Sequence, residues 1–411
     1  MHLITSLLLA ALLTQTAPTR PNPPTAPPSP PGAVPTPPTA TPATPAIMQA
    51  APPVSNEYIN WTKGTILDAT MRIGIYSNAV HMPGNPLLFP VVASSASSIV
   101  DLESIRATIT VNGSTVDQGG GVDILNPEAQ CGSNMIQAPA PTFALQQAAQ
   151  GNRIQMGFEI QQTVACWSSS VDEQAMATIP WPAAWPDALA DMLKPQPLIE
   201  SDDPIFAAAL QGLTNGTLRQ VAPWIAAKEI VKYCCNAIKA DTTVMLYGPD
   251  RVLRGLDVNG ALAAAQAEAG TACDLTCVCV AMLRAAGIPA RPVIGLGRND
   301  RNKNELLIWG EFYLPKAGWI PFDAKALQSK GVRSWTTDRS WNAFGNLSKL
   351  NKQVPLAHAF APLDLGTVYD AWSIWGWSRL QGATTIPVRI NSGNQPSSIN
   401  YSLINRGKYP E

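Results

Sequence analysis

Alternating hydrophobic and polar positions dominate the chain from about residue 56 to residue 185. The clearest alternation lies in residues 70–76, 105–111 and 154–160. This period of two is typical of β-strands that bury one face. Asn112-Gly113 follows the second of these segments and is a strong signal for a tight hairpin turn. We therefore predict an antiparallel β-sandwich domain over residues 56–185, a usual length for that class.

The pattern changes to helical spacing after about residue 195. Asp203 and Pro204 predict a helix start, because Asp caps a helix and Pro fits its first turn. Gly287 predicts the end of a later helix. The predicted helices cover residues 205–213, 223–238, 261–269 and 274–286, and predicted strands follow at 291–295, 306–314 and 319–322. Helices followed by strands in one core predict an α+β domain over residues 195–330.

The flanking segments differ from these two domains. Residues 1–17 contain a short apolar run followed by small and polar residues, which is typical of a secretory signal peptide. Residues 18–55 are rich in Pro, Thr and Ala, and we expect a disordered linker there. We expect residues 331–411 to form a C-terminal extension that packs on the core. The chain is therefore expected to be exported, in the periplasm, the cell envelope or outside the cell, with no transmembrane helix after the signal peptide is removed.

The amino-acid composition excludes some classes of binding partner. Charged residues make up 14% of the chain and the net charge is −1, which gives no electrostatic footprint for nucleic acid. The seven cysteines lack the spacing of a zinc or iron–sulfur site, and we expect neither a metal nor a cofactor. In an exported protein, Cys131 and Cys166 are the best candidates for a disulfide, because both fall in the predicted β domain.

Two stretches carry a family resemblance. Residues 270–295 read GTACDLTCVCVAMLRAAGIPARPVIG, and residues 306–323 read LLIWGEFYLPKAGWIPFD. They resemble the transglutaminase-like family, in which a Cys opens a helix that runs into an LRAxGIPAR turn. In that family a later strand reads H-x-W-x-E, and an Asp ends a GW-x-x-x-D motif. The resemblance implies a papain-like core, with the Cys helix packed on an antiparallel sheet, often after a β domain.

The resemblance implies that Cys273 is the nucleophile, which would attack a carboxamide or peptide carbonyl and form a thioester. A thiolate at a helix N-terminus has a lowered pKa, which is the reactive state. However, the family Cys lies twelve residues before the Arg of the turn, and Cys273 lies eleven before Arg284. Ala272 occupies the usual position. Either the helix begins one residue later here, or the nucleophile has been lost and Cys273 is incidental.

The family His is missing. Leu307 occupies its position and can neither accept nor donate the proton. General acid–base catalysis contributes about 10²–10⁴-fold to a reaction rate, and this contribution is lost without the His. Asp323 matches the family Asp that orients the His, and a helix or strand cap is its alternative role. Only three histidines are present, and the alternative base, His358, would have to enter the site from outside the core. A hydrogen-bonded structural role is its alternative.

Three further residues match cleft positions. Trp309 and Trp319 match residues that wall the cleft or fill the core, and Glu311 matches a strand residue that supports the fold. We treat all three as candidates for a binding cleft.

Three hypotheses about function follow from the sequence. The first is an exported protein with a degenerate triad that binds a protein or peptide ligand, or a cell-wall component. The second is an active cysteine peptidase, amidase or acyl transferase using Cys273, and the third is a purely structural envelope protein.

Overall fold

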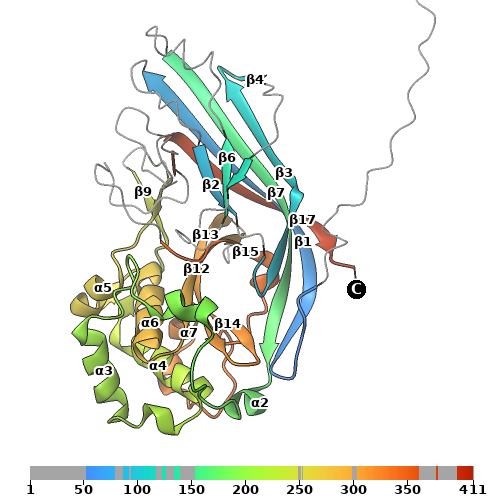
Figure 1. The fold of residues 1–411 in the computed structure, drawn as a ribbon. Coiled ribbons are helices and arrows are strands. Elements are labelled where there is room, and N and C mark those ends of the chain that lie inside the picture. The colour runs from blue at the N-terminus through green and yellow to red at the C-terminus, as the bar shows by residue number, and fades with distance from the viewer. Residues whose placement is uncertain are drawn as a thin grey trace, which may run out of the picture. The chain divides into compact units, whose positions relative to one another are not determined.

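Figure 1 shows the computed structural model of the protein. It describes residues 52–78, 87–91, 94–116, 123–125, 134–138, 153–248, 251, 253–298, 303–360, 376–377 and 396–410. The predicted signal peptide, the linker up to residue 51 and Cys131 lie outside these ranges. No helix in the described ranges has the length and apolarity needed to cross a membrane.

A five-stranded antiparallel sheet forms the first region. Its strand order is β17-β1-β7-β3-β4. The strands are β1 (Ile59–Asn78), β3 (Ser98–Val111), β4 (Ser114–Val116), β7 (Arg153–Val171) and β17 (Pro396–Lys408). The alternation predicted for β7 is confirmed, because Ile154, Met156, Phe158 and Ile160 are all buried. Asn112 and Gly113 both have positive φ angles, of 49° and 82°, and make the predicted hairpin turn between β3 and β4.

A second antiparallel sheet has the order β16-β2-β6-β5. Its strands are β2 (Leu87–Val91), β5 (Asp123–Leu125), β6 (Asn134–Ala138) and β16 (Gly376–Trp377). The antiparallel character predicted for the N-terminal region is therefore confirmed. Two C-terminal strands take part in these sheets: β17 belongs to the first sheet and β16 to the second. The sequence pattern did not predict this.

The α+β core that follows is also confirmed. Its sheet has the order β14-β13-β12-β15, with β12 (Ala290–Arg298), β13 (Asn304–Leu314), β14 (Gly318–Phe322) and β15 (Val354–Ala357). Its helices are α3 (Pro204–Thr214), α4 (Pro223–Ala237), α5 (Ala261–Ala267), α6 (Ala272–Ala285) and α7 (Ala324–Ser329). Asp203 caps α3 as predicted. Part of the expected C-terminal extension, β15, is hydrogen-bonded into this sheet beside β12.

Short elements connect these parts. They are α2 (Glu173–Ala177), β8 (Lys239–Ala240), β9 (Met245–Tyr247), β10 (Leu253–Leu256) and β11 (Ala269–Gly270). Four 3₁₀ helices are η2 (Asp187–Leu193), η3 (Leu218–Gln220), η4 (Val332–Ser334) and η5 (Leu350–Lys352).

Helix α6 lies at the centre of the core. Every side chain from Ala272 to Arg284 is buried, which is expected for a helix that is packed on all sides. It contacts α3, α4, α5 and α7, and it also packs on β12 and β13 (Figure 1). The helix is followed by Gly287, whose φ of +77° lets the chain turn back toward β12.

Candidate functional site

A capping box fixes where α6 begins. The Thr271 hydroxyl accepts a hydrogen bond from the backbone N–H of Asp274 at 3.2 Å, and the Asp274 carboxylate accepts one from the Thr271 N–H at 2.9 Å. Ala272 is therefore the first helical residue. The alternative of a helix that begins one residue later is wrong. The residue that opens the helix, which the resemblance aligns with the family Cys, is an alanine.

The Asp274 carboxylate occupies the N-terminal end of α6. It is fully buried, and one of its oxygens accepts hydrogen bonds from the backbone N–H groups of Asn259 and Gly260, at 2.7 and 3.0 Å. The partial positive charge of this helix end thus already has a buried anion against it. A second anion at this end would be repelled.

Cys273 has an environment opposite to that of an activated thiol. Its side chain is fully buried, and its thiol donates to the carbonyl oxygen of Val244 at 3.7 Å. Burial raises the pKa of this thiol well above its ordinary value, and the charges of Asp274 and Asp257 raise it further. The lowered pKa expected from the helix N-terminus is therefore wrong, because burial and neighbouring carboxylates outweigh the helix dipole.

Leu307 lies in a hydrophobic cluster on the side of β13 that faces away from α6. Trp309 lies on the same side, and the cluster also contains Val293, Leu347, Leu350 and Trp61. Leu307 pairs with Gly295 across the β12–β13 ladder. Any side chain at Gly297 would collide with Leu307, and one at Gly295 would collide with Trp309. The two glycines thus make room for the large apolar side chains of Trp309 and Leu307.

Asp323 caps a helix. Its carboxylate accepts a hydrogen bond from the backbone N–H of Ala326 at 2.8 Å and begins α7, while its own N–H donates to the Ala343 carbonyl at 2.9 Å. Burial raises the pKa of this carboxyl, and the hydrogen bond from Ala326 partly offsets that rise. This is the capping role that was the alternative to orienting a His.

His358 is buried and follows directly after β15. Strand β15 lies beside β12, on the side away from β13, so β12 separates it from the strand that holds Leu307. The groups that shift the pKa of the Cys273 thiol are three carboxylates and the Thr271 hydroxyl. A triad that joins Cys273 and His358 stays a prediction.

The residues predicted for a binding cleft have different environments. Trp309 and Glu311 are almost wholly buried, which leaves them little surface with which to contact a ligand. Glu311 forms an ion pair with Arg291 at 2.7 Å, so it supports the strands as expected. Trp319 is half-buried, and the Arg291 guanidinium lies 4.0 Å from the centre of its ring. The binding role of these residues stays a prediction.

Trp319 belongs to a strip of aromatic side chains that the sequence patterns did not reveal. Tyr313 lies edge-on to Trp319 and to Trp185, with ring centres 5.5 and 6.4 Å apart. Trp185 donates its indole N–H to the Gly287 carbonyl at 2.9 Å. All three rings are half-buried. We call Trp185, Tyr313 and Trp319 the aromatic strip.

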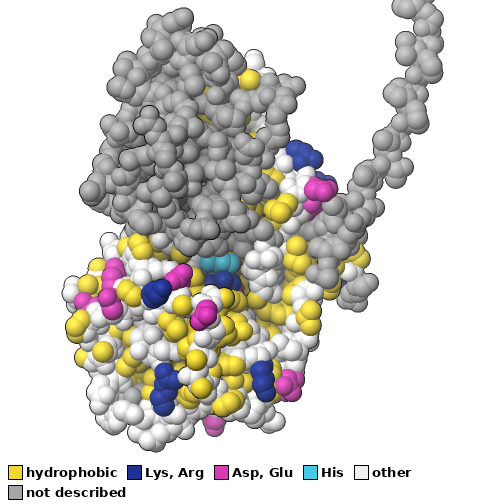
Figure 2. All heavy atoms as spheres, viewed as in Figure 1, with side chains coloured by type: hydrophobic (Ala, Val, Ile, Leu, Met, Phe, Trp, Pro, Cys, Tyr) yellow, Lys and Arg dark blue, Asp and Glu magenta, His cyan; other side chains and the backbone are white. Residues whose placement is uncertain are grey.

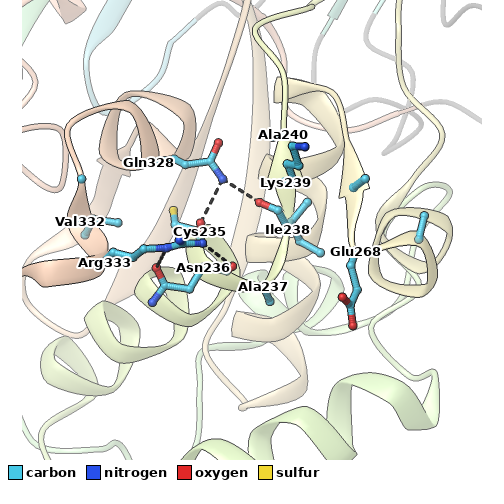
Figure 3. A pocket seen from close by; sticks show the side chains of 13 residues that line it. Cys235, Asn236, Ala237, Ile238, Lys239, Ala240, Glu268, Gln328, Val332 and Arg333 are labelled. Atoms are coloured by element: carbon cyan, nitrogen blue, oxygen red, sulfur yellow. Dashed lines mark hydrogen bonds between the residues drawn. The ribbon is translucent and has the colours of Figure 1, made fainter.

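A pocket of about 720 Å³ lies at the C-terminal end of α4 (Figure 3). Cys235, Asn236, Ile238 and Lys239 line one part of it, and Glu268, Gln328 and Arg333 line another. No sequence motif marks these residues. On the molecular face in Figure 2, charged side chains of both signs are scattered. The described part of the chain contains no group of three or more side chains placed to hold a metal ion.

The described cysteines are free thiols. Cys166 is buried in β7, where it serves as a small apolar group. Its predicted disulfide partner, Cys131, lies outside the described residues. The other described cysteines, Cys234, Cys235, Cys273, Cys277 and Cys279, are also free and buried.

Comparison with solved structures gives several likenesses. A "putative cysteine protease" from Cytophaga hutchinsonii has a TM-score of 0.51 at 13% identity, covering 85% of this chain and 93% of that chain. The periplasmic domain of TgpA from Pseudomonas aeruginosa has a TM-score of 0.27 at 13% identity, covering 64% of this chain and 89% of that one. The first likeness supports the fold alone, and the second carries no argument.

No curated protein matches the chain. Residues 211–324 match the core model of the transglutaminase-like superfamily. This segment begins within α3 and includes α6, β12, β13, β14 and the first residue of α7, which together hold both motif stretches. The chain therefore contains a core domain of the transglutaminase-like superfamily.

Proposed function

We propose that the transglutaminase-like domain of this chain has lost its acyl-transfer chemistry and acts as a non-catalytic binding module. One observation carries the proposal: α6 begins with Ala272. The resemblance to the family adds a second reason, because it aligns Leu307 with the family His. Neither residue can supply a nucleophile or a general base. The fold and the chemistry of a domain are separable, so a preserved core does not imply a preserved reaction.

The nearest thiol does not replace the missing nucleophile. The Cys273 side chain is fully buried and points to the Val244 carbonyl, so a substrate carbonyl has no route to the sulfur in this conformation. Its raised pKa keeps the thiol protonated near neutral pH, and the protonated thiol is the unreactive form. The buried carboxylate of Asp274 adds a charge that opposes thiolate formation.

A protein or peptide is the ligand class we propose, and the aromatic strip supports it. Trp and Tyr, together with Arg, are the residue types that contribute most to protein interfaces. Arg291 stacks on Trp319, and its charge is already paired with Glu311, so the strip favours no strongly charged ligand. The signal pattern of residues 1–17 supports export, and we propose that the module works in the cell envelope or outside the cell.

Activity assays test whether the domain has lost acyl-transfer activity. The full chain is incubated with a quenched fluorescent peptide library and, separately, with a glutamine peptide and a primary amine. Cys273→Ala serves as the matched control. We expect the same background rate for both proteins, and no iodoacetamide labelling of Cys273 below pH 7. Turnover that Cys273→Ala abolishes would instead establish the alternative function, an active cysteine peptidase, amidase or acyl transferase.

Peptide binding is tested separately. A random peptide library displayed on phage is panned against the full chain and against Trp319→Ala. Tyr247→Ala is the control, because Tyr247 is an aromatic residue that is 53% exposed and lies outside the strip. We expect peptides enriched by the native chain to be lost with Trp319→Ala and retained with Tyr247→Ala. No enrichment over an unrelated protein would count against a binding module.

A further inference from the structure

The pocket at the C-terminal end of α4 has the size of a small-molecule binding site. Its volume of about 720 Å³ lies within the range of about 300–1,000 Å³ that is usual for such sites. Alanine methyl groups and the side chains of Ile238 and Val332 give it apolar surface, and charged side chains complete its lining. No residue of the aromatic strip lines it, so this site is separate from the proposed peptide-binding surface.

One wall of the pocket favours an anion. Four of its backbone carbonyl groups already accept hydrogen bonds, at 2.7–3.2 Å, from the side chains of Gln328, Arg333 and Lys325. These are the carbonyl groups of Cys235, Asn236, Ile238 and Ala240. Arg333 also donates to the Asn236 side chain at 3.3 Å, which holds the guanidinium along the end of α4. With these acceptors occupied and a guanidinium beside them, this wall suits a carboxylate.

The other wall carries a carboxylate of its own. Glu268 directly follows α5 and lines the pocket, and its carbonyl accepts a hydrogen bond from the Lys239 N–H at 2.8 Å. Both side chains are exposed, and within the described ranges neither the Glu268 carboxylate nor the Lys239 ammonium forms an ion pair. Figure 3 shows Glu268 and Arg333 on opposite sides of Ile238. The Glu268 carboxylate is therefore available to a cationic group of a ligand.

We propose that this pocket binds a short peptide by its two free ends. The N-terminal ammonium of the peptide pairs with the Glu268 carboxylate, and its C-terminal carboxylate pairs with the Arg333 guanidinium. Asn236 uses two of the five N–H groups of Arg333, so three remain for the ligand. A purely anionic ligand meets the charge of Glu268, and a purely cationic one meets those of Arg333 and Lys239. Opposite charges on one molecule therefore fit best.

This inference goes beyond the proposed function and does not depend on it. The aromatic strip needs no free chain ends in its ligand, whereas the pocket recognises both ends. Free short peptides are the products of peptide-bond hydrolysis, because each cleavage leaves a new ammonium and a new carboxylate. A reaction of that class must therefore supply the ligand of this site.

Trialanine is the probe, and the measurement is isothermal titration calorimetry with the full chain at pH 7. Low ionic strength is used, because salt screens charges that lie at a surface. We expect trialanine to bind. N-acetyl-trialanine and trialanine amide should each bind about 3–10-fold more weakly, since each has lost one terminal charge.

Two exposed substitutions assign the ends of the ligand. Glu268→Gln should bind trialanine and N-acetyl-trialanine equally, because no carboxylate is left to distinguish them. Arg333→Gln should bind trialanine and trialanine amide equally for the corresponding reason. Lys330→Gln is the matched control, because Lys330 is an exposed cation near these residues in sequence that does not line the pocket. It should keep both preferences.

Three results would overturn the proposal. They are no binding of trialanine at millimolar concentrations, equal binding of the three peptides by the native chain, and a preference that persists in the variant meant to remove it. None of them bears on the aromatic strip, which the phage experiment with Trp319→Ala tests. A failure of this proposal is therefore distinguishable from a failure of the proposed function.

Discussion

The two ends of α6 have different environments. At the C-terminal end, the Arg284 guanidinium is buried and donates to the carbonyls of Ala290 and Lys194, at 2.7 and 2.6 Å. Burial lowers the pKa of Arg284 to about 10, which still leaves it charged at neutral pH. At the N-terminal end, the helix begins with Ala272, and the neighbouring thiol of Cys273 is fully buried.

The difference suggests a structural role for the C-terminal end of α6. Removing Arg284 would leave the carbonyl of the buried residue Ala290 without this donor, so we expect the fold to depend on it. A catalytic Cys or His contributes its chemistry and little folding energy, so a substitution there has a small structural cost. A motif of scaffold residues can therefore persist while the reaction is lost. The following four experiments test this difference between the two ends.

The largest effect is expected for Arg284→Met. It removes the donors to Ala290 and Lys194 and should lower the free energy of unfolding by about 3 kcal/mol or more. Urea unfolding monitored by Trp fluorescence measures the change. Arg406→Met is the control, because its ion pair with Asp68 is at the surface and should contribute less than about 1 kcal/mol. Equal costs for both variants would contradict a structural role for the C-terminal end.

The next largest effect is the difference in stability between substitutions of the two helix-capping carboxylates, Asp274 and Asp323. Asp274→Ala leaves the N–H groups of Thr271, Asn259 and Gly260 without an acceptor and should cost about 2–4 kcal/mol. Asp323→Ala loses the single cap to Ala326 and should cost about 1 kcal/mol. The same unfolding assay at neutral pH compares them. A larger cost at Asp323 would indicate that this retained family residue does more than cap α7.

A smaller effect should appear in the pH dependence of stability. The pKa of Cys273 is raised in the folded state, so its contribution is fully present below the ordinary thiol pKa and is lost as pH rises above it. At pH 10 the loss from one such thiol is about 2 kcal/mol. Urea unfolding measures the free energy of unfolding at pH 7.5 and at pH 10. Between these two pH values it should fall less for Cys273→Ala than for the native chain. An unchanged difference would mean that Cys273 ionises normally in the folded state.

No gain in catalytic rate is expected for Leu307→His, which places an imidazole where the resemblance to the family expects a His. Peptide hydrolysis should stay at the blank rate, because Ala272 offers no nucleophile and Cys273 is buried. The free energy of unfolding should fall by about 1–2 kcal/mol, since a half-buried apolar contact is exchanged for a polar ring. Rate enhancement by Leu307→His that disappears with Cys273→Ala would show that a working dyad needs only the imidazole.

Local patterns predicted much of the fold. Asp203 and Gly287 marked a helix start and a helix end correctly, and the alternation around Phe158 identified a strand with one buried face. These signals are short-range, because capping and pleating depend on residues a few positions apart. The capping role of Asp323 was among the expected alternatives for the same reason.

Long-range features could not be predicted from such patterns. Strand β17 pairs with β1 although more than half of the chain separates them, and no local period encodes that partner. The protonation of Cys273 depends on Asp257 and on total burial, both of which come from the fold. Helix position alone suggested the opposite pKa shift. The aromatic strip likewise joins residues of distant segments, from Trp185 to Trp319.

The pairing of β17 with β1 has a consequence for biosynthesis. A chain that is made, or threaded across a membrane, from its N-terminus presents β1 long before residues 396–408 exist to cover its edge. Until then β1 exposes unpaired backbone groups, which in other proteins recruit stray strands and chaperones. The five-stranded sheet therefore closes only after residues 396–408 have been made and have paired with β1.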